Sequence, residues 1–426
     1  MLSEKIKETY TDILKEELIP AMGCTEPIAI AYAAAILRDA LGCEPEKISA
    51  SFSGNIIKNV KSVIVPATGG KHGIQSAIAA GIVSARPDKR LEVLSALGED
   101  GGERIDALLC RCDIEVSELN TRCTFEMRII GTVGDISAEV RLEGDHTNVT
   151  LVTLSGEDIT AKYSQKRNTD GTLASSADRS LLNVMDIVSY ADEAELSEIE
   201  AYLSRQIETN MAIAREGLGN TYGASIGQLL LSYGEDVRRR AAAHAAAGSD
   251  ARMSGCEMPV TIISGSGNQG ITASVPVVVY AEALGASREK LLRALIVSNL
   301  VTVHQKTGIG TLSAYCGAVS AGVGAGAGIC YLHGGDFHAI AHTIVNAVAI
   351  LSGTICDGAK PSCAAKIAMA VDAGIMGFEM AKTNRQFYGG DGIVTKGVEN
   401  TIRNVGRLAR DGMMETDKEI IKIMLQ

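Results

Sequence analysis

The stretch from Thr307 to Gly335 constrains the fold more than any other, because it contains no Lys, Arg, Asp or Glu. Only seven of the eighty residues from 301 to 380 are of these four types. An apolar run of more than about 18 residues is a candidate membrane span. The segment TGIGTLSAYCGAVSAGVGAGAGICYL, however, consists mostly of Gly, Ala, Ser and Thr, whose small side chains gain little free energy in lipid. We therefore predict a closely packed helix buried in protein, with a membrane span as the alternative.

The length of the chain predicts more than one folding unit. Its 426 residues exceed what a single compact core usually holds. Hydrophobic residues make up 46% of the chain, yet aromatic residues make up only 4% and Trp is absent. The core must therefore consist mainly of Ala, Val, Ile and Leu.

The charge balance and the N-terminus exclude several classes of protein. A formal net charge of -11 argues against nucleic-acid binding, which requires clustered Lys and Arg. The densest basic block, VRRRAAAHAAA at 237–247, is typical of the solvated face of an alanine-rich helix. The N-terminal MLSEKIKETYTDILKEEL has helical spacing without the apolar centre of a signal peptide, so we expect a cytoplasmic protein. In a reducing compartment, the ten cysteines are expected to serve packing, catalysis or metal binding rather than disulfides.

Helical and strand-like patterns divide the chain into two kinds of region. Residues 1–42 predict two helices joined by a turn, and residues 180–247 return to a helical period. Between them, KNVKSVIVPATGG predicts a strand entering a glycine turn, HGIQSAIAAGIVSA predicts a helix, and RCTFEMRIIGTV, DISAEVRLEG and TNVTLVTLSGE predict antiparallel hairpins. We therefore predict an α+β protein in which a mainly helical domain, residues 1–46 and 172–426, carries an inserted, smaller α+β domain with antiparallel strands, residues 47–171.

Three cysteines of the charge-poor half are candidate metal ligands. Cys316 stands in SAYCGAVSAG, and Cys356 and Cys363 stand in GTICDGAKPSCAA. Thiolates are the usual ligands of iron–sulfur clusters, and a cluster held by three of them leaves one iron free for substrate. Separations of 40 and 7 residues match neither ferredoxin runs nor zinc-binding CxxC pairs, so small buried hydrophobes are the alternative. The glycines and the proline around the second and third cysteines favour a loop folded onto a ligand.

Glycine-rich turns form a second group of candidates. TIISGSGNQGITASVPVVVY contains the spacing GxGxxG of dinucleotide-binding folds, but a proline and a β-branched run follow it and no acidic residue ends a second strand. We interpret the loop instead as a nest of backbone N–H groups suited to a small carboxylate, with a purely structural turn as the alternative. Its polar side chains are Ser264, Ser266, Asn268 and Gln269. The turns VPATGGKHG and HQKTGIGTLSAYCG each add a cation, Lys71 or Lys306, that could bind the same group.

The segment IPAMGCTEPIAIAYAAA places Cys24 on a glycine turn before an alanine-rich helix. We expect Thr25 to cap this helix, so that Cys24 faces the positive end of the helix dipole. That environment lowers a thiol's pKa and favours a reactive thiolate, whereas a thiol that only fills a tight turn is the alternative. His338 and His342, at i and i+4 in DFHAIAHTI, could hold zinc, but the glutamate of HExxH is missing and no third ligand is evident.

Several of these motifs together resemble one known family. GCTEP, SGSGNQG, GDGIVTKGVENTIRNVGRLARDGM and the set Cys316, Cys356 and Cys363 resemble the L-cysteine desulfidase family, which is related to the α chain of bacterial iron–sulfur L-serine dehydratases. The resemblance covers essentially the whole chain. It implies a 4Fe–4S cluster held by these three cysteines in the helical domain, with Cys24 on the substrate side. Cys256 or Cys330 could replace one of the three ligands.

The resemblance also implies a reaction, a lyase that needs no pyridoxal phosphate. An amino acid would bind the free iron through its carboxylate and β-substituent, and a base would remove the α-proton. L-Cysteine would then give sulfide, pyruvate and ammonia. Cys24 is the first candidate for the base and Lys306 the second, ahead of His304 and His72. The substrate contacts would come from Ser264, Ser266, Asn268, Gln269 and Lys71.

Two other functions remain open at this point. One is L-serine dehydratase activity, because motifs that position a cluster do not choose the leaving group. The other is a non-catalytic, cluster-containing redox sensor or cysteine-binding protein. In each case we expect a small amino acid as ligand, no nucleic acid or membrane partner, and a homodimer, since glycine-rich helices often pack against a second subunit.

Overall fold

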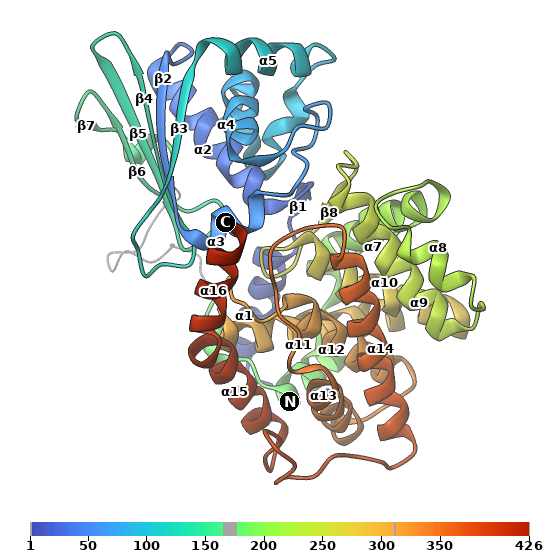
Figure 1. Ribbon diagram of the computed structural model, residues 1–426. Coiled ribbons are helices and arrows are strands. Elements are labelled where there is room, and N and C mark those ends of the chain that lie inside the picture. Colours follow the sequence, from blue (N-terminus) through green and yellow to red (C-terminus); the bar gives the residue numbers. More distant parts are fainter. Residues whose placement is uncertain (1, 165–176, 311, 426) are drawn as a thin grey trace.

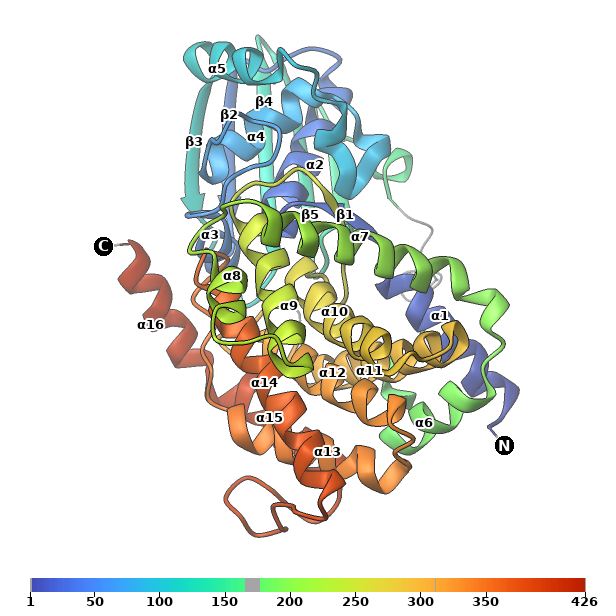
Figure 2. The same ribbon diagram turned by 90° about the vertical axis from the view of Figure 1, so that its right-hand side faces the viewer.

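The computed structural model describes residues 2–164, 177–310 and 312–425. A six-stranded sheet with helices on one face forms the upper unit in Figure 1, and a bundle of helices forms the lower unit. The mainly helical α+β class predicted from the sequence is confirmed. Figure 2, turned by 90°, shows the bundle directly below the sheet unit.

The sheet has the strand order β3-β2-β4-β5-β6-β7. Its strands are β2 (Lys47–Phe52), β3 (Asp113–Glu118), β4 (Glu126–Val133), β5 (Ile136–Glu143), β6 (Val149–Leu154) and β7 (Glu157–Asp158). Only β2 and β3 run parallel; the other pairs are antiparallel, so the predicted hairpins of β4, β5 and β6 are confirmed. Alternate residues of β4 are buried, and they face α2 (Thr25–Leu41), which packs on β4, β5 and α4 (Gly73–Ser84). One face of the sheet is therefore covered and contributes to the core.

One predicted strand is wrong. The first three residues of KNVKSVIVPATGG end α3 (Gly54–Val60). The described residues after them in this stretch form one isolated bridge, between Ile64 and His72. The helix turns three polar side chains, Asn55, Lys58 and Asn59, into the interior. The strand prediction failed because Lys58 and Asn59 are buried by contacts with residues distant in the sequence, which the local pattern does not show.

The charge-poor segment forms the centre of the bundle, as α12 (Gly317–Leu332), and is buried along its length. It packs on α10 (Gly267–Leu284), α11 (Arg288–Ile309), α13 (Phe337–Leu351) and α14 (Cys363–Lys382). A Cβ at Gly322 would lie 2.3 Å from the carbonyl oxygen of Ala370, and one at Gly326 would lie 2.4 Å from that of Gly374. The glycines therefore set how closely α12 and α14 approach. Within the described ranges, no helix is both long and apolar enough to cross a membrane.

The remaining elements include a second, two-stranded sheet. The short strand β1 (Pro20–Met22) pairs antiparallel with β8 (Pro259–Thr261). The other α-helices are α1 (Glu4–Glu17), α5 (Gly101–Arg111), α6 (Val184–Glu193), α7 (Glu200–Gly219), α8 (Ile226–Leu231), α9 (Val237–Met253), α15 (Val398–Arg407) and α16 (Met414–Leu425). Short 3-10 segments cover Pro87–Ala96, Thr160–Lys162, Arg179–Leu181 and Leu196–Glu198, and a π-turn covers Leu408–Gly412.

The C-terminal helix α16 returns to the sheet unit and ends beside α3 (Figure 1). There the Lys58 ammonium, whose side chain is 1% exposed, pairs with Asp417 of α16 and donates to the carbonyl oxygen of Cys356. Lys58 of α3 thus links α16 to the loop that carries Cys356. Helix α2 packs on the sheet, and the domain division at residues 46 and 172 stays a prediction.

Candidate functional site

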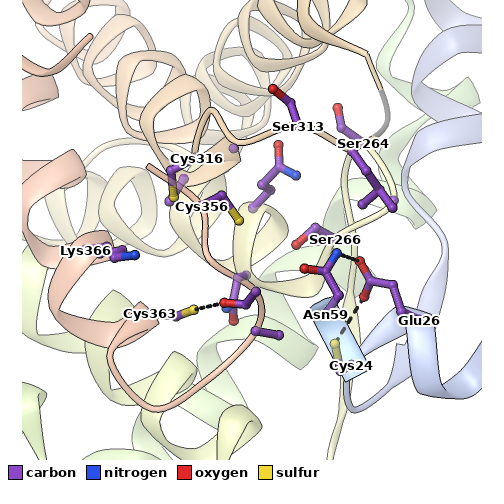
Figure 3. Close-up of a pocket in the computed structure, with 18 of the residues that line it drawn as sticks. Cys24, Glu26, Asn59, Ser264, Ser266, Ser313, Cys316, Cys356, Cys363 and Lys366 are labelled. Carbon is purple, nitrogen blue, oxygen red and sulfur yellow. Dashed lines mark hydrogen bonds between the residues drawn. The ribbon is translucent and has the colours of Figure 1, made fainter. Parts of the chain in front are cut away.

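One pocket between the sheet unit and the bundle gathers most of the predicted site residues (Figure 3). Its cavity volume is about 100 Å³. We call it the thiol pocket. The predicted residues that line it are Cys24, Ser264, Ser266, Asn268, Gln269, Lys306, Cys316, Cys356 and Cys363.

The pairing of β1 with β8 explains how distant segments meet there. Pro20 lies opposite Thr261 and Met22 opposite Pro259, so the turn that follows β1 is held beside the loop that follows β8. The backbone of Thr261 is fixed by the side-chain amide of Asn210, at 2.9 and 3.1 Å. Gly23 makes the turn possible, with φ +64° and no room for a Cβ beside Pro66.

The three cluster-type cysteines lie where a loop and two helix N-termini converge. Cys316 is the N-cap of α12, Cys363 is the first residue of α14, and Cys356 lies in the loop before α14. The two segments bind each other through backbone bonds from the Cys316 N–H to Thr354 and from the Cys356 N–H to Ala314. Helix N-termini favour thiolates, and the predicted loop around the second and third cysteines is confirmed.

Neighbouring groups shift the acidity of these thiols. A hydrogen bond from the Cys316 thiol, together with the charges of Lys58 and Lys366, lowers the pKa of Cys356 to about 6. The same bond, and then burial, raise the pKa of Cys316. Burial raises the pKa of Cys363, whose thiol lies 3.8 Å from the carbonyl oxygen of Gly358 (Figure 3). Cys356 is therefore the thiol of this group that ionises most readily.

Two alternative cysteine ligands lie elsewhere. Cys330 is buried near the C-terminal end of α12, where burial raises its pKa to about 11. Cys256 follows α9, and neither residue lines the thiol pocket. The structure therefore brings Cys316, Cys356 and Cys363 together without them.

Cys24 lies on the wall of the pocket that the sheet unit contributes (Figure 3). It is itself the N-cap of α2, so the prediction that Thr25 caps this helix is wrong. Its thiol donates to Oε2 of Glu26 at 3.1 Å, and Asn59 donates to Oε1 of the same carboxylate at 3.0 Å. Burial, and next the charge of Glu26, raise the pKa of Cys24 well above its usual range. Desolvation and the neighbouring anion therefore outweigh the helix dipole, so Cys24 rests as a protonated thiol.

The glycine-rich loop 264–269 leads from β8 into α10. Ser264 and Gly265 have φ of +47° and +70°, and Ser266 is the N-cap. Oxygens of Ser264, Asn268 and Gln269 are buried without a partner among the described residues. The dinucleotide interpretation is wrong, because β8 belongs to a two-stranded antiparallel sheet and Gly267 and Gly270 lie inside the helix. The loop instead directs polar oxygens at the pocket.

The two predicted lysines have different environments. Lys306 is buried on α11, its Nζ donates to the carbonyl oxygen of Gly310 at 2.8 Å, and burial lowers its pKa. Lys71 does not line the thiol pocket; it pairs with Asp106 at 2.9 Å. Its prediction as a substrate contact is not supported, because the nearby acidic residue of α5 holds the ammonium.

The histidine candidates also lie outside the pocket. His304 binds Glu399 at 2.7 Å, and His72 is the N-cap of α4. In the part of the chain that is described, no three His, Cys, Asp or Glu side chains are grouped tightly enough to hold one metal ion. The zinc interpretation of His338 and His342 is therefore wrong.

Residues absent from the sequence prediction complete the thiol pocket. Besides Glu26 and Asn59, the pocket is lined by His146, Arg252 and Tyr315. Each of these three carries a buried polar atom without a partner among the described residues. The signal for Glu26 was its place in GCTEP, and the signal for Arg252 was a lone cation ending the small-residue run AAAHAAAGSDAR. His146 gave no signal, since it reaches the pocket from the β5–β6 turn.

A second cavity adjoins the first. It shares His146, Ser264, Gly265 and Lys306 with the thiol pocket, and seven of its other fifteen lining residues are charged, among them Lys89 and Arg90. Solvent therefore reaches the edge of the site between the β5–β6 turn and the glycine-rich loop.

Comparisons with known proteins identify the family. The profile of the serine dehydratase alpha chain matches residues 88–422. A UPF0597 protein of Desulfitobacterium hafniense is 54% identical over 99% of this chain and 97% of its own length. Those of Lachnoclostridium phytofermentans and Treponema denticola are 48% and 44% identical, over 97% and 100% of this chain and 98% and 99% of their own lengths. The chain therefore belongs to the UPF0597 family and carries a serine dehydratase alpha chain domain over residues 88–422.

Proposed function

We propose that this protein is an iron–sulfur lyase, independent of pyridoxal phosphate, that eliminates the β-substituent of L-cysteine. The products are sulfide and aminoacrylate, and water converts the aminoacrylate to pyruvate and ammonia. The family match supports the broader class, a serine dehydratase-like activity. The observation that carries the proposal is that Cys316, Cys356 and Cys363 line one pocket opposite Cys24.

The donor set fits a 4Fe–4S cluster better than a single ion. The thiols are too dispersed for one metal ion, whereas each cysteine of a cluster binds a different iron. The positive charges of Lys58 and Lys366 act on Cys356 and offset the negative charge of bound thiolates. When bound, such a cluster supplies a Lewis-acidic iron that polarises the leaving group. We therefore propose Cys316, Cys356 and Cys363 as its ligands.

Side chains of the opposite wall are placed to move protons. Cys24 rests as a thiol that donates to Oε2 of Glu26, and Asn59 holds the other carboxylate oxygen. Transfer of the thiol proton to Glu26 leaves a thiolate at Sγ, which we propose as the base for the α-proton. Lys306, whose pKa is lowered by burial, is the second group able to carry a proton in this pocket.

Polar oxygens of the glycine-rich loop orient the substrate. Ser264, Asn268 and Gln269 each present a buried oxygen without a partner in the described chain. A buried acceptor of this kind is costly unless a ligand donates to it. We propose that these oxygens bind the α-ammonium group of the amino acid.

L-Serine is the second candidate substrate, because the matching family is named for serine dehydratase. The two differ only in the leaving group, hydroxide or hydrosulfide. A cluster-containing redox sensor or cysteine-binding protein without turnover is the third candidate.

Anaerobic reconstitution with iron and sulfide, followed by parallel assays with L-cysteine and L-serine, tests the proposal. We expect a brown protein that forms sulfide and pyruvate in equal amounts from L-cysteine. Faster pyruvate formation from L-serine would favour the second substrate, and cluster without turnover would favour the sensor. A colourless, inactive protein would contradict the proposal.

Variants of single cysteines test the residue roles. Cys24→Ala should keep the cluster absorbance and lose activity by about 100-fold or more, because the proton acceptor is removed. Cys316→Ser should lose iron. Cys330→Ala is the matched control, since this cysteine is buried in the same helix but does not line the pocket. Full activity of the Cys24 variant would refute its role as base.

A further inference from the structure

Arg252 is a buried cation whose side chain has no partner among the described residues. Its side chain lies in the last turn of α9, is 3% exposed and lines the thiol pocket. None of the residues that the structure describes forms a hydrogen bond or ion pair with it, and its Nε is fully buried. An isolated charge in a protein interior carries a large desolvation cost unless an anion compensates it. The carboxylate of Glu26 in the same pocket is held by Cys24 and Asn59, so a bound anion would supply the charge that compensates Arg252.

The N-terminus of α10 adds a second positive feature at the same place. A Cβ at Gly267 would lie 2.4 Å from Nε of Arg252 and 2.9 Å from its Cζ, so the guanidinium rests on the first residue of this 18-residue helix. Ser266 forms no side-chain cap, and the N–H groups of Asn268 and Gln269 donate to no described residue. Free N–H groups and the helix dipole favour an anion. Glycine at 267 leaves the space that the guanidinium occupies.

We propose that Arg252 and the first turn of α10 bind the α-carboxylate of the substrate. This proposal rests on the proposed function, because it assumes that the thiol pocket binds a free amino acid. Arg suits a planar carboxylate, since its guanidinium can donate two parallel hydrogen bonds. The buried side-chain oxygens of Asn268 and Gln269, which have no partner among the described residues, belong to the same turn and accept hydrogen bonds from the ammonium group of the substrate. The site consequently selects amino acids with a free carboxylate over their esters, amides and decarboxylated amines.

Calorimetric titration with L-alanine of the protein, prepared as for the activity assay, tests the inference. L-Alanine has no leaving group, so binding is measured without turnover, and L-alaninamide is the matched ligand without a carboxylate. We expect the wild type to bind L-alanine at least 10-fold more tightly than L-alaninamide. Arg252→Met should weaken L-alanine binding by about 10- to 100-fold, the usual effect of losing a hydrogen-bonded charge, and Arg252→Lys should fall between.

Arg240→Met is the control for the substitution itself. Arg240 lies on the same helix and also has a buried Nε without a partner among the described residues, but it does not line the pocket. Its variant should bind L-alanine as the wild type does. The ligand-free Arg252→Met protein should unfold at the same or a higher urea concentration than the wild type, because an unpaired buried charge has been removed. A structural role for Arg252 would instead lower that concentration.

The outcomes separate this inference from the proposed function. Equal L-alanine binding by the wild type and Arg252→Met overturns the inference, even if L-cysteine is converted. Equal binding of L-alanine and L-alaninamide, or no binding of either, also overturns it. If Arg252-dependent L-alanine binding occurs in a protein without lyase activity, the inference stands and the proposed reaction fails.

Discussion

Replacing Gly322 by alanine should separate α12 from α14 and destabilise the protein. The added Cβ would lie 2.3 Å from the carbonyl oxygen of Ala370 and 2.5 Å from its carbonyl carbon. Ordinary contact begins near 3.4 Å, so the two helices would have to move apart by roughly 1 Å, and backbone cannot yield as a flexible side chain does. Overpacking costs about 1–3 kcal/mol, and alanine returns about 1 kcal/mol of helix propensity. Taking the upper figure for a backbone clash, we expect a net loss of about 2 kcal/mol.

Urea denaturation, monitored by far-UV circular dichroism, measures this loss of stability. Gly219→Ala is the matched control, since Gly219 ends α7 and a Cβ there meets nothing within 4 Å. That variant should match the wild type or gain up to about 1 kcal/mol. A Gly322→Ala protein that unfolds at the same urea concentration as Gly219→Ala would refute the close-packing argument.

The same variant bears on the thiol pocket. Cys316 caps α12 and Cys363 begins α14, so the contact between these helices fixes the separation of two thiols. Gly322→Ala should therefore retain less iron after reconstitution than Gly219→Ala, provided that the proposed cluster is bound there. Equal iron content in the two variants would show that the contact does not position the thiols.

Four further predictions concern single groups. Lys58→Met should lower the free energy of unfolding by about 3–5 kcal/mol in urea denaturation, because Asp417, 13% exposed, loses its partner. The double variant with Asp417→Leu should recover most of this loss, and no recovery would contradict the pairing. Burial raises the pKa of Asp250 from 3.8 to about 6. Its contribution to stability is therefore present below pH 4, and the free energy of unfolding falls by about 3 kcal/mol as the pH rises to 6. Asp250→Asn should flatten this fall, and an unchanged pH profile would refute the assignment. Burial and Glu26 raise the pKa of Cys24, so iodoacetamide at pH 8 should modify the exposed Cys43 at least about 10-fold faster by mass spectrometry; equal rates would refute the burial of a protonated thiol. We also propose a homodimer, which light scattering would detect as about 89 kDa, twice the chain mass of 44.7 kDa, whereas 44.7 kDa would contradict it.

Local patterns predicted much of the fold. The hairpins of β4 to β6 follow from alternating side chains and turn residues, and α2 ends at Gly42, which adopts φ +71°. The parallel pairing of β2 with β3 could not be predicted, because three helices separate these strands and no neighbouring residue records their contact. The misjudged segment around α3 has the same origin, since Lys58 and Asn59 are buried by partners far along the chain.

The candidate site was predictable where helix breakers mark it. Gly358 and the loop around Cys356 and Cys363 have sequence signals of this kind. Lys71 and Arg252 show the limit of prediction from local sequence. Each is a cation beside small residues, and only its partner in the folded protein decides its role. Lys71 meets Asp106, 35 positions later, whereas Arg252 meets no acidic side chain among the described residues. Such differences depend on tertiary packing and leave no trace in the local sequence.

The pair between Lys58 and Asp417 couples a helix outside the thiol pocket to one of the pocket's thiols. Lys58 donates to the carbonyl oxygen of Cys356 and pairs with Asp417 on α16, which lies 359 positions away along the chain. Loosening of α16 would leave the Lys58 ammonium buried and uncompensated beside the loop of Cys356. Local unfolding of this helix would therefore reach the thiol that ionises most readily, although no residue of α16 lines the pocket.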